Sequence, residues 1–132
     1  MKIYLDSSAI VKLVQKEAHS DPLRRYLRQH SSDERVTSSL ARVEVVRAVA
    51  GGGGPAIADA QRQLARLHQV NLDAALLDSA ATIGPGLVLR SLDAIHLACA
   101  QLVGGDLRTV VTYDQRMSTA ATALGLPRSA PT

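Results

Sequence analysis

The sequence predicts an α/β fold, a parallel sheet of four to five short strands sandwiched between helices. Short apolar stretches typical of buried strands alternate along the chain with longer stretches whose apolar residues recur at helical spacing. Acidic residues follow directly after two of the predicted strands, where sheets of this class commonly place functional groups. With 132 residues, the chain is expected to form a single domain over positions 1–132.

The predicted elements follow in order from the amino terminus. A strand over Lys2–Leu5 runs into Asp6, and two helices come next, the second with Pro22 in its first turn. Later strands are predicted at Arg35–Thr37, Val70–Leu72 and Thr109–Thr112; later helices are predicted from Ser38 or Ser39 to Ala50, Pro55 to His68, Asp73 to about Gly84, Ser91 through Leu102, and Asp114 to Leu124. Most of these helix starts offer a Ser, Asp or Pro, residues that favour the first turn of a helix.

The run Gly51–Gly54 is predicted to be a hinge or turn. Four consecutive glycines inside a helix would each cost roughly 1 kcal/mol relative to Ala. A phosphate-binding loop would need a Gly-Lys-Ser/Thr ending, whereas this run ends in Pro55. The glycines therefore separate two helices and do not predict a nucleotide site.

Composition narrows the class of protein. Phe and Trp are absent and only three Tyr are present, so the core must be aliphatic and a base-stacking platform is poor. The one cysteine, Cys99, cannot form an internal disulfide, and no apolar run approaches the roughly 20 residues that span a bilayer. We therefore expect a soluble protein of the reducing cytoplasm. The net charge is +3 and most of the basic residues are Arg, which weakly favours a polyanion held by its phosphates.

Four acidic residues occupy positions with possible chemistry. Asp6 and Asp114 each follow a predicted strand, although a helix N-cap is the commoner explanation for either residue alone. Glu44 interrupts an apolar helical run, and its alternative is an exposed position paired with Arg47. Asp93 lies two residues beyond Ser91, where the helix dipole favours a carboxylate. Only the set of four favours function over a structural role.

Two other reactive residues are interpreted as structural. His96 lies three residues after Asp93, but a lone histidine beside an apolar face is more often structural, so no metal-ligand role is assigned to it. Cys99 continues the apolar stripe of the same helix and has no basic neighbour in sequence that would lower its pKa.

Convergence of the four carboxylates at one end of the sheet would create a cation site. Hard oxygen ligands without a Cys or His cluster select Mg²⁺ or Mn²⁺, and paired ions about 4 Å apart promote phosphodiester hydrolysis. Without metal, mutual repulsion should raise the pKa of some of these acids. The pattern thus indicates hydrolytic nuclease chemistry.

Four segments together resemble the PIN-domain family, and most closely its VapC toxins. They are Ile3–Ala9, Ala41–Glu44, Ser91–Ala98 and Val111–Met117. The resemblance implies a PIN-like fold in which Asp6, Glu44, Asp93 and Asp114 match the metal-holding acids, with Asp114 acting either directly or through water. It also implies cleavage of structured RNA, such as a transfer or ribosomal RNA loop, restraint by an antitoxin protein, and a homodimer.

Two other functions could also place acidic residues at strand ends. A receiver-type phosphoacceptor domain also carries acids at strand ends, but it usually needs a late lysine, and the only lysines are Lys2, Lys12 and Lys16. A non-catalytic PIN-like module would keep the acids structurally and bind RNA or a protein without cleavage. Metal-dependent cleavage by the purified protein separates this module from a nuclease.

Overall fold

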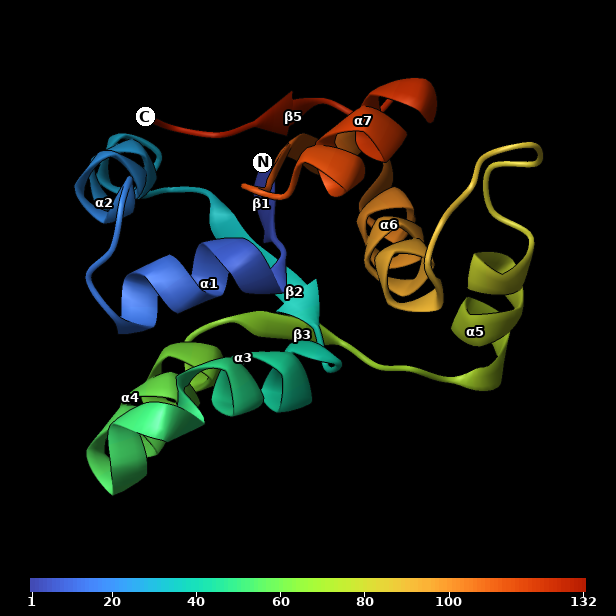
Figure 1. Ribbon diagram of the computed structural model, residues 1–132. Helices are drawn as coiled ribbons and strands as arrows, with labels where there is room; N and C mark the ends of the chain where they lie inside the picture. Colours follow the sequence, from blue (N-terminus) through green and yellow to red (C-terminus); the bar gives the residue numbers. More distant parts are fainter.

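The computed structural model describes all 132 residues and contains one five-stranded sheet (Figure 1). Every pair of neighbouring strands is parallel, and the strand order is β3-β2-β1-β4-β5. The strands are β1 (Lys2–Leu5), β2 (Glu34–Ser38), β3 (His68–Val70), β4 (Leu107–Val111) and β5 (Arg128–Ser129). The predicted parallel α/β architecture is confirmed.

Helices cover both faces of the sheet. In Figure 1 the first four helices lie together on one side of the strands and the last three on the other. They are α1 (Ser7–Val14), α2 (Ser20–Gln29), α3 (Ala41–Val49), α4 (Gly53–Ala65), α5 (Ala74–Ala81), α6 (Ser91–Val103) and α7 (Gln115–Ala123); short 3₁₀ turns, η1 (Ala50–Gly52) and η2 (Gly104–Asp106), follow α3 and α6.

The central strand β1 supplies side chains to two separate cores. Ile3 and Leu5 pack with buried residues of α1 to α4, while Tyr4 packs with buried residues of α5 and α6. This alternation follows from the two-residue period of a strand covered on both faces. All three side chains are fully buried, so β1 is fixed between the two helical layers.

Some boundaries differ from the predictions because tertiary pairing decides them. Strand β3 lies two residues earlier than expected, since it pairs with β2 from Val36 opposite His68 to Ser38 opposite Val70. The preceding helix accordingly ends at Ala65, and β5, which pairs through only two residues, was not predicted. Helices α3 and α6 begin after Leu40 and Arg90, without the expected serine caps.

The glycine run forms the junction between α3 and α4. Gly53 has a φ of 79°, a left-handed value that a residue with a side chain rarely adopts, and α4 begins there. Pro55 lies in the first turn of α4, where its missing N–H is tolerated. The predicted break between two helices is confirmed.

None of the helices combines the length and the apolar character that crossing a membrane would require.

Candidate active site

The four predicted site residues, which we call the acid cluster, are Asp6, Glu44, Asp93 and Asp114. Asp6 directly follows β1, and Asp114 comes three residues after β4. Glu44 lies in the first turn of α3, just after β2, and Asp93 in the first turn of α6. Because α6 crosses back before β4, its first turn lies at the same carboxyl edge of the sheet.

Asp6 is held rigidly by hydrogen bonds. Its Oδ1 accepts from the Ala9 backbone N–H at 3.0 Å and from Ser8 Oγ at 2.6 Å, and its Oδ2 accepts from the Thr112 hydroxyl. The side chain caps α1, as the alternative interpretation predicted, yet the residue is only 3% exposed. Burial raises the pKa of Asp6, and the hydrogen bonds from Ser8 and Thr112 offset this effect only in part.

This cause differs from the expected mutual repulsion among the acids. The main causes of the Asp6 pKa are burial, which raises it, and hydrogen bonds from Ser8, Thr112 and Ala9, which lower it; no carboxylate is among these causes. Asp6 also has no Lys or Arg ion-pair partner. A buried carboxylate without a nearby cation is costly to ionise, so this position favours binding of a positive ion.

Glu44 receives two hydrogen bonds on the same oxygen. Ser7 Oγ donates to Oε1 at 2.7 Å, and His96 Nε2 lies 2.6 Å from it. Because a carboxylate only accepts, His96 must carry a proton on Nε2; its Nδ1 then accepts from the Tyr4 hydroxyl at 2.7 Å. Burial raises the pKa of Tyr4, which keeps the phenol protonated as the donor. The result is a relay of oriented bonds from Tyr4 through His96 to Glu44.

The relay keeps Glu44 ionised. Burial alone would raise the pKa of this half-buried group, but hydrogen bonds from His96 and Ser7 and the charge of Arg90 outweigh that effect. The net pKa of Glu44 is therefore lowered. The alternative pairing with exposed Arg47 is wrong, because Glu44 bonds across the sheet edge to α6 and to the start of α1.

Sequence reasoning assigned His96 no part in the site. The structure places its ring, 3% exposed as a side chain, between Tyr4 and Glu44. His96 is a positioning residue, because it acts through Glu44. Its spacing from Asp93, three residues along the same helix, was a usable signal: such residues share one helical face.

Arg90 joins the other two acids. Its Nε donates to Asp93 Oδ2 at 3.1 Å, and its Nη2 lies 3.6 Å from Asp114 Oδ2. Asp114 is also the N-cap of α7, accepting from the Arg116 and Met117 backbone N–H groups. Thr112 connects the two halves of the cluster, since its hydroxyl donates to Asp6 and accepts from the Asp114 N–H at 3.1 Å.

The acid cluster matches a divalent cation by its chemistry. Its oxygen donors suit Mg²⁺ or Mn²⁺, and Asp6 is a buried carboxylate without an ion-pair partner. As the side chains stand, no three His, Cys, Asp or Glu residues are grouped closely enough to hold an ion, and Arg90 already lies between Asp93 and Asp114. Holding an ion with all four carboxylates would require Arg90 to move.

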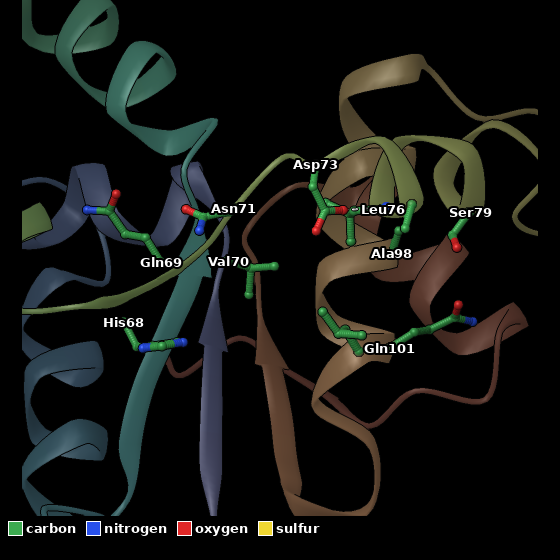
Figure 2. A pocket seen from close by; sticks show the side chains of 11 residues that line it. His68, Gln69, Val70, Asn71, Asp73, Leu76, Ser79, Ala98 and Gln101 are labelled. Carbon is green, nitrogen blue, oxygen red and sulfur yellow. Dashed lines mark hydrogen bonds between the residues drawn. The ribbon is translucent and has the colours of Figure 1, made fainter.

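A separate cavity, away from the acid cluster, lacks this set of carboxylates. It has a volume of about 600 Å³ and lies between β3, α5 and α6. Figure 2 shows Val70 from β3, Asp73 at the start of α5 and Gln101 from α6 around it. No member of the acid cluster lines it, and neither Lys nor Arg does.

Comparisons with known proteins identify the family. The family model of the PIN domain matches residues 3–123. Ribonuclease VapC46 of Mycobacterium tuberculosis is 51% identical over 129 residues, covering 98% of this chain and 97% of that protein. Ribonuclease VapC35 of the same organism is 44% identical over 134 residues, covering 98% and 96%.

Solved structures share the fold at low sequence identity. The Mycobacterium tuberculosis VapC20 toxin, described as cleaving the sarcin-ricin loop, matches with a TM-score of 0.70 and 20% identity over 89% of this chain and 94% of that chain. VapBC2 of Rickettsia felis, bound to a promoter DNA fragment, matches with a TM-score of 0.72 and 17% identity over 100% of both chains. Together with the family model and the full-length relatives, these matches establish that the chain belongs to the PIN-domain family, as a VapC-type member.

Proposed function

We propose that the protein is a Mg²⁺- or Mn²⁺-dependent endoribonuclease that hydrolyses phosphodiester bonds in structured RNA. The observation that carries the proposal is Asp6, a buried carboxylate at the carboxyl edge of the sheet without an ion-pair partner. Such a group is stable in its charged form when a cation binds beside it. The names of the ribonuclease relatives and the basic net charge of +3 support RNA as the polyanionic substrate.

Each member of the acid cluster has a role in this proposal. Asp6, Glu44 and Asp93 would hold the ion, and Asp114 would act either directly or through water. When bound, the divalent ion would activate water and stabilise the leaving oxygen of the phosphodiester. The protein contributes the fixed orientation of Asp6 and, through His96, a Glu44 that remains charged at neutral pH.

The decisive test is RNA cleavage by purified protein with a matched set of variants. We expect cleavage with magnesium or manganese, none with chelator, and none from Asp6→Asn or Glu44→Gln. Asp73→Asn is the control, because Asp73 caps α5 by the same kind of bond that Asp6 makes, to the Leu76 N–H at 2.8 Å, but lies outside the cluster. Undiminished cleavage in chelator, with contaminating nucleases excluded, would contradict the metal mechanism.

One observation favours a second candidate, a PIN-like module that binds RNA or a protein without cleaving. As noted, no three metal-capable side chains are grouped in the structure. A module of this kind would bind RNA equally well with chelator and leave it intact. Cleavage that depends on the acid cluster would exclude this candidate.

We further propose that the nuclease is the toxin of a toxin–antitoxin pair, active in the cytoplasm as a homodimer. The VapC names of the relatives and the VapBC complex among the structural matches support a protein antitoxin for this chain. Expression of the chain alone should halt growth, and co-expression of the neighbouring antitoxin should restore it. A purified protein that cleaves RNA but is harmless in cells would refute the toxin role alone. Light scattering tests the dimer.

A further inference from the structure

A second cavity opens directly beside the acid cluster. Its volume is about 500 Å³, and it lies between the loop that precedes α6 and the helix α7. This loop is the yellow segment joining α5 and α6 in Figure 1. Arg90 and Asp93 line the cavity and also belong to the site described above. A ligand in the cavity would therefore lie next to the proposed reacting phosphate.

One part of the cavity wall is apolar. The loop contributes Leu87, Val88 and Leu89, and α7 contributes Ala120 and Ala123. Val88 is fully exposed and Leu87 is 38% exposed, so neither side chain is fully buried within the protein. A base that is turned out of its stack can be held between apolar side chains as well as aromatic ones.

The rest of the wall can form hydrogen bonds. Gln115 and Thr119 lie one helical turn apart on α7, and their only side-chain contact with each other is a long one of 3.4 Å. An amide and a hydroxyl offer both donors and acceptors, which is what reading the edge of a base requires. These groups remain available for a ligand.

The cavity also contains a positively charged side chain that forms no ion pair within the protein. Arg116 lines it and is exposed, and none of the ion pairs within the protein includes this residue. A guanidinium binds phosphate through two parallel hydrogen bonds. The larger cavity of Figure 2 has neither this charge nor contact with the acid cluster.

We propose that this cavity binds the base of a nucleotide next to the scissile phosphate of the RNA substrate. Gln115 and Thr119 read the edge of the base, the apolar wall packs on its face, and Arg116 binds a neighbouring backbone phosphate. The volume lies within the roughly 300–1,000 Å³ of small-molecule sites. This inference rests on the proposed ribonuclease function and makes the cavity the source of its sequence preference.

The test is a cleavage profile on single-stranded RNA with a randomised segment, in manganese, with sequencing of the new ends. Wild type should favour one base at a fixed position beside the cut. Ala123→Leu fills the cavity, and Thr119→Val removes one hydroxyl with little change of shape. Each should weaken that preference roughly threefold to tenfold, the value of about one hydrogen bond, and leave other positions unchanged. Ala48→Leu, at an exposed α3 position outside the cavity, is the control and should match wild type.

The outcomes separate this inference from the proposed function. An unchanged preference in both cavity variants, or no preference beside the cut in wild type, would overturn the base site while leaving the nuclease intact. A profile like that of wild type combined with escape from antitoxin inhibition would assign the cavity to the antitoxin and also overturn it. Absence of any cleavage by wild type would overturn the ribonuclease function and the base site together. If Ala123→Leu does not fold, Thr119→Val decides.

Discussion

The two edges of the sheet treat buried carboxylates in opposite ways. At the amino edge, Asp33 just before β2 meets the Arg108 guanidinium of β4 and the amino group of Met1, and its side chain is 3% exposed. At the carboxyl edge, Arg90 pairs with Asp93 and Asp114 and His96 bonds to Glu44, whereas Asp6 has no ion-pair partner. Carboxylates outnumber their cationic partners at the carboxyl edge, whereas the buried Asp33 at the amino edge contacts two cations.

The pKa values express this difference. The hydrogen bond from Arg108 lowers the pKa of Asp33 to about 2, whereas burial raises the pKa of Asp6. Two buried aspartates at opposite edges of one sheet thus have opposite pKa shifts, set by whether a cation lies beside them. The ion pair at the amino edge stabilises the fold, whereas the carboxyl edge leaves Asp6 buried without a cation, as the proposed metal site requires.

The largest expected effect is a separation of activity from stability. Asp93→Asn should lower the RNA cleavage rate on the order of 100-fold or more, because it removes a proposed metal ligand, and should leave the melting temperature near that of wild type. Asp33→Asn should do the reverse: it should melt earlier and cleave normally per folded molecule. Cleavage rates at a temperature where circular dichroism shows both variants folded would check this. Equal loss of activity in both would abolish the contrast between the edges.

The second effect is the pH dependence of the stability that Asp33 contributes at the amino edge. A folded pKa of about 2, against the ordinary 3.8, means that between these values the native state binds fewer protons than the unfolded state. The stabilisation by Asp33 is therefore complete above about pH 4 and is lost as the pH falls towards 2. Thermal melts of wild type and Asp33→Asn should differ most at neutral pH and converge in acid. A difference that stayed constant down to pH 2 would show that the ion pair is not its source.

The third effect is at the carboxyl edge, where ionisation of Asp6 is expected to change stability in the opposite direction. A raised folded pKa means that ionisation of Asp6 opposes folding as the pH climbs from 3.8 through the folded value, and the cost remains at pH 7. Asp6→Asn should therefore be as stable as wild type or slightly more stable in chelator. Millimolar manganese should stabilise wild type more than the variant. A wild type that melts well above Asp6→Asn in chelator and gains nothing from manganese would contradict a shared cation site.

The smallest expected change in stability concerns an exposed ion pair at the amino edge. Lys2 Nζ lies 3.9 Å from Glu34 Oε2, and both side chains are well exposed, at 37% and 49%. Exposed pairs contribute little, so Lys2→Ala should change the free energy of unfolding by less than about 0.5 kcal/mol. Urea denaturation measures this directly. A loss comparable to that of Asp33→Asn would mean that net charge at this edge, and not burial of the pair, provides the stability.

Local sequence patterns predicted the parts of the site that depend on local contacts. Asp6 and Asp114 each cap the helix that follows, through backbone N–H groups within three residues, so a strand followed by an acid was sufficient to locate both. The alternation of apolar stretches likewise predicted the four longer strands. The position of β3 required knowledge of its pairing with β2, which no local pattern contains.

The relay required contacts between distant parts of the chain. Tyr4 and His96 are 92 positions apart, and His96 and Glu44 are 52 apart. Each of these residues alone looks like an ordinary buried or exposed side chain. Arg90 was also missed. Its pair with Asp93 is local, three residues along the chain, but its contact with Asp114 exists only when α6 and α7 are brought together.

The relay also couples the two halves of the molecule. Tyr4 belongs to the core beneath α5 and α6, whereas Glu44 belongs to α3 on the opposite face, so His96 joins the two layers around the end of the central strand. Local openings of a protein cost less free energy than global unfolding. An opening that parted these layers would break the His96–Glu44 bond and free the carboxylate from its fixed orientation. The proposed active site would then lose its geometry while most of the helices were still folded, so we expect a partly opened chain not to cleave RNA.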